Sequence, residues 1–283
     1  MTSVGIFGLG LIGCALGQRL IEKGYAPCGF DPSEERRAKL NDMGGLASSA
    51  KDVWASDVVF SCVFDTDQLA GLIDEAPSCG SILVSLSTCD PDRMEGLAGV
   101  AAAKGITLVE SPISGTSGAL AKGEVLLLVA GDHEVSQQIE PLLSAVSQQF
   151  IHVGDIGNGN RAKLAINLVL GLNRAAMAEG IAYAEAIGLN GSDFLTLARA
   201  SAAHSRAMDS KGDQMVQRAF EPQGRIVQSA KDFALIQQSA AAVGQGLPFT
   251  ATYLAMMQDA LDNGEGDLDN SAILLPIART PPT

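Results

Sequence analysis

Basic side chains are scarce in this sequence. Its 283 residues include 19 lysines and arginines against 32 aspartates and glutamates, so the formal net charge is −13. A protein that binds nucleic acid regardless of its sequence must neutralise phosphates with lysine and arginine. The charge therefore argues against nucleic acid as a partner, and an anionic ligand would have to be held by local groups.

Patterns for disulfides and metal ligands are also missing. The five cysteines lie in the first third of the chain, are odd in number and form no C-x-x-C pair. This argues against a disulfide framework or a thiolate zinc site and favours a reducing, cytoplasmic compartment. The three histidines are widely spaced and match no metal-ligand pattern. We therefore expect no metal cofactor.

Leader and membrane-spanning patterns are absent as well. The first residues, MTSVGIFGLGLIG, have no basic segment and turn glycine-rich where a signal peptide would continue its apolar run. The most apolar segment, residues 158–189, still carries Lys163, Arg174, Glu179 and Glu185, so no uncharged run reaches the roughly 20 residues that a bilayer requires. We expect a soluble, cytoplasmic protein without a membrane partner.

Two patterns divide the chain. Residues 3–153 alternate short β-branched apolar runs with segments of helical composition, which predicts an α/β domain with a parallel sheet covered on both faces. The expected strands are 3–8, 26–31, 57–64, 81–87, 107–113, 125–131 and 150–154. From about residue 160 the sequence predicts only helices. The expected domains are 1–157 and 158–283.

One predicted helix is unusually long and apolar. Residues 158–187 form a continuous pattern of about 30 residues, or about 45 Å, with apolar side chains on nearly every side. This predicts a helix buried all round, between domains or between subunits. Together with the alanine-rich second half it offers more apolar surface than one subunit readily buries, so we expect a homodimer or homotetramer. The closing TPPT is expected to be disordered.

A glycine motif, GLGLIG at residues 8–13, follows the first expected strand and opens a helix. In this context the first glycine permits a tight turn, the second lets the backbone approach a pyrophosphate, and the third lets the helix pack on the strand. The spacing alone would be weak evidence in a chain with 31 glycines. Its place between strand and helix predicts a dinucleotide site formed by Gly8, Gly10, Leu11, Ile12 and Gly13.

An acidic residue, Asp31, ends the second expected strand. A carboxylate here can accept hydrogen bonds from the adenosine ribose and repel a 2′-phosphate, which favours NAD over NADP. The alternative is that Asp31 only caps a helix beginning at Pro32. Because Arg36 and Arg37 follow closely, use of NADP also stays open.

Several ordered motifs resemble the β-hydroxyacid dehydrogenase family, which includes 3-hydroxyisobutyrate dehydrogenase, tartronate semialdehyde reductase and, more distantly, 6-phosphogluconate dehydrogenase. They are IFGLGLIG at 6–13, SLSTCDP at 85–91, ESPISGTSGALAKGE at 110–124, GNGNRAKLAIN at 157–167 and SAKDFALI at 229–236. The resemblance implies a Rossmann-type domain, a long helix and an all-α domain. It also implies hydride transfer between a nicotinamide cofactor and a small 3-hydroxy acid or the corresponding semialdehyde.

The resemblance also implies binding roles for two loops and for a further lysine. Ser114 and Gly115, followed by Thr116, would bind the substrate carboxylate through a hydroxyl and backbone amides, as a small-residue loop after a strand can do. Thr88, next to Ser87, would lie near the nicotinamide ribose. Lys231 would line the cofactor side of the substrate cleft that the family resemblance implies. The alternative for Lys231 is a solvated pair with its neighbour Asp232.

Lys163 and Asn167 carry the expected chemistry. Oxidising an alcohol requires a side chain that takes the hydroxyl proton as hydride leaves carbon, and a lysine can do so if desolvation and a nearby nicotinamide cation lower its pKa. The two residues lie four apart and hence on one helix face. By resemblance Lys163 is the catalytic acid/base and Asn167 holds the reacting oxygen or the lysine. The alternative is a lysine that reaches solvent near the helix start.

The chain departs from the family pattern near the expected substrate pocket. Thr116 replaces a common second glycine, Ile166 a carboxamide and Ser85 an acidic residue, while Leu170 replaces the glutamate of the decarboxylating members. We therefore expect oxidation or reduction without decarboxylation. Two alternatives stay open: an imine reductase, a class that usually replaces the lysine, and a non-catalytic dinucleotide-binding module.

Overall fold

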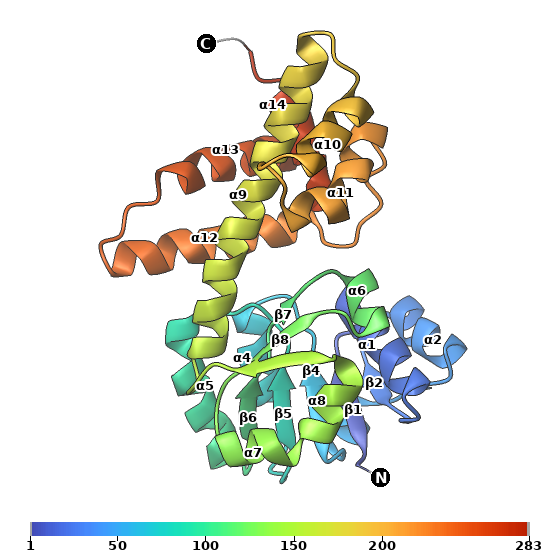
Figure 1. The fold of residues 1–283 in the computed structure, drawn as a ribbon. Coiled ribbons are helices and arrows are strands. Elements are labelled where there is room, and N and C mark those ends of the chain that lie inside the picture. Colours follow the sequence, from blue (N-terminus) through green and yellow to red (C-terminus); the bar gives the residue numbers. More distant parts are fainter. Residues whose placement is uncertain (1, 282–283) are drawn as a thin grey trace. The chain divides into compact units, whose positions relative to one another are not determined.

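The computed structural model describes residues 2–281 (Figure 1). The chain divides into two compact units, Met1–Lys163 and Leu164–Thr283. The last two residues of the closing TPPT lie outside the described part, so the expected disorder there is not addressed by the structure. Each unit is described by itself below.

The first unit is built on a parallel sheet of six strands. They are β1 (Val4–Phe7), β2 (Cys28–Phe30), β3 (Leu46–Ala47), β4 (Val58–Ser61), β5 (Ile82–Ser85) and β6 (Thr107–Glu110). Their order is β3-β2-β1-β4-β5-β6, and every neighbouring pair is parallel. The expected Rossmann-type sheet is confirmed. The two-residue strand β3 was not expected, because so short a segment has no readable periodicity.

A second, three-stranded sheet follows along the chain: β7 (Ile113–Ser114), β8 (Leu126–Val129) and β9 (Gln149–His152). Strand β7 is antiparallel to β8, whereas β8 and β9 are parallel. The sequence predicted one strand over 107–113, but the chain breaks after Glu110 and continues as β7. Pro112 stands at this break, where it has no amide to donate to a ladder.

Helices cover the large sheet on both faces. Those of the first unit are α1 (Leu11–Glu22), α2 (Glu34–Asp42), α3 (Ala50–Trp54), α4 (Thr66–Asp74), α5 (Pro91–Ala103), α6 (Ser117–Lys122), α7 (His133–Gln138) and α8 (Glu140–Val146). Successive strand residues point to opposite faces: Ile6 and Phe60 join the apolar core that includes Leu16 of α1. Their neighbours Phe7 and Val59 join a separate core with residues of α3, α4 and α5.

The second unit is helical throughout its described residues. It contains most of α9 (Asn158–Ala186), then α10 (Gly191–Ala200), α11 (Arg206–Gln217), α12 (Ile226–Ala242), α13 (Pro248–Asp262), the 3₁₀ turn η1 (Asn270–Ile273) and α14 (Leu274–Ala278). Phe233 of α12 and Tyr253 of α13 form an edge-to-face pair with ring centroids 4.7 Å apart in its core. The expected all-α second part is confirmed.

Helix α9 is as long as the sequence predicted, but its burial differs. Met177, Ala178 and Ile181 enter the core of the second unit, whereas Val169 and Tyr183 are 60% and 66% exposed. The single chain therefore does not bury the helix on every side, and burial between subunits stays a prediction. By length and composition α9 could also cross a membrane; core helices of globular proteins meet the same criterion, so this is weak evidence.

Candidate functional site

The large sheet reverses its strand order between β1 and β4. From β1 the chain moves outward to β2 and β3, and it returns on the other side of β1 as β4. In open α/β sheets, ligands bind outside the carboxyl ends of the strands at such a point. Here the glycine motif follows β1, and Cys62 follows β4 with its amide donating to the carbonyl of Phe7 (2.8 Å).

The glycine motif is held tightly between β1 and α1. Gly8 has a φ of +83°, and a Cβ there would lie 2.7 Å from the carbonyl oxygen of Cys62. A Cβ at Gly13 would lie 1.8 Å from the carbonyl oxygen of Gly8, so helix and loop can touch only without a side chain. At Gly10, the first residue before α1, a Cβ would meet no protein atom within 4 Å. This open side at the helix N-terminus fits the pyrophosphate of a dinucleotide.

Asp31 braces the glycine motif. One carboxylate oxygen accepts the amide of Leu9 at 2.9 Å and lies 3.4 Å from the Arg36 guanidinium, and the other accepts the amide of Ser33 at 2.9 Å. The residue is 3% exposed. The capping alternative is not what the structure has, because α2 begins at Glu34 with Ser33 as its N-cap. Contact with a ribose stays a prediction.

Arg36 and Arg37 differ in what they hold. Arg36 pairs with the Asp31 carboxylate and keeps a side chain 45% exposed. Arg37 donates to the backbone carbonyl of Asp31 at 2.6 Å and lies over the Phe30 ring, 5.9 Å from its centroid. Arg36 thus partly offsets the charge of the carboxylate from which the sequence predicted NAD preference, which weakens the repulsion of a further phosphate.

The loop after β5 carries Ser87 and Thr88. Both are largely buried, at 5% and 8% exposure. The Ser87 hydroxyl donates to the carbonyl of Val63 at 2.7 Å and so connects this loop to the loop after β4. Asp90 then caps α5 by accepting the amide of Asp92. The loop therefore lies at the carboxyl edge of the sheet, where the prediction for Thr88 requires it.

The expected carboxylate-binding loop joins β7 to α6. Ser114 pairs with Leu126 in the small sheet, and Gly115 follows it. Thr116 is the N-cap of α6, and its hydroxyl oxygen accepts the amide of Ala119 at 3.2 Å. Capping of α6 is therefore a local structural reason for Thr116, which departs from the family pattern. The substrate-binding roles of the three residues stay predictions.

Lys163 and Asn167 lie four residues apart on the uninterrupted helix α9. Lys163 is 7% exposed, so it is not the solvent-reaching lysine of the alternative. The Asn167 amide donates to the Asp232 carboxylate at 2.9 Å. Asp232 also pairs with Lys231 at 3.0 Å, with side chains only 10% and 16% exposed. The solvated pair expected as the alternative for Lys231 is therefore wrong.

Two functional candidates were missed in the sequence: Glu110, at the end of β6, and Asn160, in the first turn of α9. Both are fully buried and hydrogen-bonded to each other. Burial raises the pKa of Glu110 above its ordinary value, although the amides of Gly157 and Asn160 oppose that shift. The only sequence signal was a charged residue at the end of an apolar strand.

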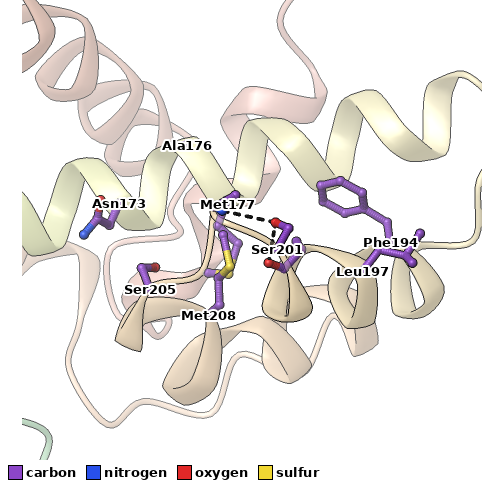
Figure 2. Close-up of a pocket in the computed structure, with 10 residues that line it drawn as sticks. Asn173, Ala176, Met177, Phe194, Leu197, Ser201, Ser205 and Met208 are labelled. Atoms are coloured by element: carbon purple, nitrogen blue, oxygen red, sulfur yellow. Dashed lines mark hydrogen bonds between the residues drawn. The ribbon is translucent and has the colours of Figure 1, made fainter.

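The second unit contains a cavity of about 430 Å³ between α9, α10 and α11. Figure 2 shows Phe194, Leu197, Met177 and Met208 around it, together with Asn173 and the two serines Ser201 and Ser205. None of the residues predicted from the sequence lines it.

Metal ligands form no site in the described residues. Between residues 2 and 281, no cluster of three or more His, Cys, Asp or Glu side chains could hold an ion. The glycine motif at the carboxyl edge of the sheet fits a dinucleotide. Fold and edge together define a dinucleotide-binding oxidoreductase.

Two family models match nearly all of the chain. The NAD binding domain of 6-phosphogluconate dehydrogenase matches residues 3–154, and the NAD-binding model of NADP-dependent 3-hydroxyisobutyrate dehydrogenase matches residues 157–277. The chain belongs to the β-hydroxyacid dehydrogenase family of NAD(P)-dependent oxidoreductases. The predicted family, enzyme class and NAD(P) cofactor are thereby confirmed.

Individual relatives agree with this assignment. The chain is 28% identical to the probable 3-hydroxyisobutyrate dehydrogenase-like 1, mitochondrial, of Arabidopsis thaliana, covering 98% of this chain and 86% of the relative. It is also 28% identical to the 2-(hydroxymethyl)glutarate dehydrogenase of Eubacterium barkeri, covering 96% and 93%. Relatives of this kind support oxidation of small 3-hydroxy acids, or reduction of semialdehydes, as the activity class.

Solved structures support the fold. The 3-hydroxyisobutyrate dehydrogenase from Salmonella typhimurium is similar at a TM-score of 0.88 and 25% identity, covering 97% of this chain and 99% of that one. An imine reductase from Pseudomonas sp. is similar at a lower TM-score of 0.68 and 21% identity, covering 98% and 99%. The second likeness concerns the fold alone, so imine reduction stays a secondary alternative.

Proposed function

We propose that Lys163 is the general acid/base of a non-decarboxylating hydride transfer between NAD or NADP and a small 3-hydroxy acid or its semialdehyde. The observation that carries this proposal is a nearly buried lysine, 7% exposed, one helical turn before an asparagine that a buried carboxylate holds. A buried lysine changes its pKa readily, which suits an acid/base. The position also matches the lysine expected from the family motif.

The cofactor, when bound, supplies or accepts the hydride. During oxidation Lys163 takes the proton from the substrate hydroxyl through its Nζ, and during reduction its ammonium returns that proton to the forming alkoxide. Asp232 accepts the Asn167 amide hydrogen, which turns the Asn167 carbonyl oxygen toward the remaining side of the carboxamide. That oxygen is an acceptor for the substrate hydroxyl or for the lysine.

Substrate and cofactor would be held by the loops at the edge of the large sheet. Ser114, Gly115 and Thr116 would bind the substrate carboxylate through the Ser114 hydroxyl and backbone amides; the cap that Thr116 provides to α6 would fix their orientation. The glycine motif and Asp31 would hold the dinucleotide, and Thr88 and Lys231 would contact its nicotinamide half. In this scheme residues 1–157 bind most of the cofactor, and Lys231 of the second part adds a contact to it.

Residues 158–283 would then serve substrate binding and assembly. An apolar stripe, formed by Val169 and Tyr183 of α9 and by Ile187 directly after it, has each residue more than half exposed and supports a homodimer or homotetramer in which a second copy covers it. Leu197 of α10 is 65% exposed and extends the apolar surface. The absence of a paired-cysteine pattern supports a cytoplasmic location.

A substrate-panel assay tests the proposed chemistry. The purified enzyme is offered small 3-hydroxy acids, semialdehydes and cyclic imines with NAD(H) and NADP(H), and nicotinamide absorbance is followed. Wild type should turn over the 3-hydroxy acids and semialdehydes, without carbon dioxide release. Lys163→Ala should lower kcat by about 10²- to 10⁴-fold. Equal rates in both proteins would refute the role of Lys163, and faster reduction of imines than of any semialdehyde would favour the imine reductase.

A further inference from the structure

Three segments of the first unit meet at the carboxamide of Asn160. This residue lies in the first turn of α9 and is fully buried. Its carbonyl oxygen accepts the amide of Cys89 at 2.7 Å, and its NH₂ group donates to the Glu110 carboxylate at 3.1 Å. Because one end of the group accepts and the other donates, the geometry fixes its orientation.

Glu110 completes the connection from the end of β6. Its carboxylate accepts the backbone amides of Gly157 and Asn160, the latter at 2.8 Å. These amides belong to the helix N-terminus, where backbone donors have no intrahelical partner and negative charge is favoured. The approach is so close that a Cβ at Gly159 would lie 2.6 Å from a Glu110 oxygen and 3.1 Å from the Leu128 carbonyl. Glu110 therefore caps α9 from a distant strand.

This network joins the loop expected to contact the cofactor to the helix turn that carries Lys163. Cys89 directly follows Ser87 and Thr88, the residues expected at the nicotinamide ribose. Lys163 lies three residues after Asn160, less than one helical turn further along α9. Strand β6 is in turn hydrogen-bonded to the end of β5, since the amide of Ser111 donates to the carbonyl of Ser85 at 2.8 Å.

We propose that Asn160 and Glu110 are positioning residues that hold the turn bearing Lys163 in register with the loop at residues 87–89. The proposal rests on the proposed role of Lys163 and adds how that lysine is aimed. Neither residue touches the reacting atoms in this scheme. Their contribution is geometric, because displacement of a catalytic group by about 1 Å can cost about 10²-fold in rate.

If Asn160 served only to fill space in the core, it would not need a carboxamide. An apolar residue of similar volume would fill the space around Asn160 without joining Cys89 to Glu110, and a buried polar group is expensive unless every donor and acceptor is satisfied. Here the network satisfies both ends of the carboxamide and both carboxylate oxygens. The bonds thus specify a geometry that packing alone would leave free.

A double-mutant cycle tests the proposal. Asn160→Leu is compared with wild type and, separately, in a Lys163→Ala background. In the wild-type background we expect kcat to fall about 10- to 100-fold, the pH profile of kcat to change, and KM to change by less than threefold. In the Lys163→Ala background the same substitution should change kcat by less than threefold, because the group it aims is gone.

Asn158→Ala, two positions earlier in the same helix and less buried, is the matched control and should leave kcat and its pH profile unchanged. Circular dichroism and thermal unfolding verify the fold of every variant. If Asn160→Leu does not fold, Glu110→Gln takes its place with the same expected pattern, because it preserves shape but puts an NH₂ group against at least one donor at the helix start.

An unchanged kcat for Asn160→Leu, or an equal loss in both backgrounds, would overturn the positioning role. A Lys163→Ala enzyme as active as wild type would instead refute the proposed acid/base. The two failures are therefore distinguishable.

Discussion

The two units bury a carboxylate in opposite ways. Glu110 in the first unit is held by amides and forms no ion pair among the described residues, and burial raises its pKa. For Asp269 in the second unit burial acts in the same direction. There, however, the hydrogen bond and charge of Lys211, with the amides of Gln223 and Ser271, outweigh burial and bring the pKa below its ordinary value. A cation partner, rather than depth of burial, decides which form of a buried acid the fold prefers.

The difference also concerns what each acid connects. Glu110 joins strand to helix start through backbone amides. Asp269 pairs with Lys211 of α11 at 2.8 Å and accepts the amide of Gln223, so it joins a helix to the loop before α12. Amide-bound acids tolerate loss of charge better than ion-paired acids tolerate loss of the cation, because only the latter leaves an uncompensated charge. We make four predictions about buried and exposed charged side chains, from the largest expected effect to the smallest.

Lys211→Met should be the most destabilising of these substitutions. It leaves Asp269, which is fully buried, without its cation, and breaking such a pair typically costs about 3–5 kcal/mol of unfolding free energy. Urea denaturation followed by circular dichroism measures it. Asp269→Asn in a Lys211→Met background is the control and should recover part of the loss; a single variant as stable as wild type would show that the pair is not needed.

Asp31→Asn should change cofactor preference. In the wild type, the Arg36 guanidinium lies 3.4 Å from the Asp31 carboxylate. Removing the carboxylate charge leaves this guanidinium available for a phosphate. A charge-assisted hydrogen bond is worth about 1.5–3 kcal/mol, which corresponds to about tenfold or more in affinity. The ratio of NAD to NADP dissociation constants, measured by titration calorimetry, should therefore shift toward NADP by about that factor. Arg36→Ala in the same background should abolish the shift, and an unshifted ratio would remove Asp31 from cofactor choice.

Acid should affect the two carboxylates in opposite directions. Since the folded pKa of Asp269 is lowered, its contribution to stability is present above its ordinary pKa and is lost as pH falls through the folded value. The folded pKa of Glu110 is raised, so its contribution is present below its ordinary pKa and is lost as pH rises through the folded value. Unfolding free energies measured from pH 3 to 7 should show a smaller fall on acidification for Asp269→Asn than for wild type. The fall should be larger for Glu110→Gln; identical slopes in all three proteins would contradict both directions.

Arg93→Ala should have the smallest effect. Arg93 pairs with Asp67 at 2.6 Å, but their side chains are 45% and 83% exposed. Solvent screens such pairs, and many contribute nothing measurable. The melting temperature should stay within error of wild type at physiological salt. A clear decrease would mean that this surface pair belongs to a larger network.

How far the sequence predicts this molecule depends on the range of the interaction. Period-two and helical patterns are local, so they predicted five of the six strands of the large sheet and the length of α9. The bonds from Asn167 to Asp232 and from Asn160 to Glu110 join residues 65 and 50 positions apart. No local pattern encodes such partners, and the exposure of Val169 and Tyr183 likewise depends on what packs against the helix.

The candidate site shows the same limit. The glycine motif was readable because each glycine answers a local steric demand, and Lys163 because a family motif surrounds it. The sequence did not predict the hydrogen bond from the Leu9 amide to Asp31. This contact depends on how β2 lies beside β1. The break after Glu110 was missed for a similar reason, since β7 belongs to a different sheet from β6.

The contact between Gly13 and Gly8 has a practical consequence for anyone who wishes to re-engineer this enzyme. Since a side chain at Gly13 would lie 1.8 Å from the Gly8 carbonyl oxygen, the cradle for the pyrophosphate is a fixed scaffold that libraries should leave alone. Diversity can instead be introduced at Arg36, whose side chain is 45% exposed, whereas Asp31 should be kept because it accepts the Leu9 amide that holds the cradle.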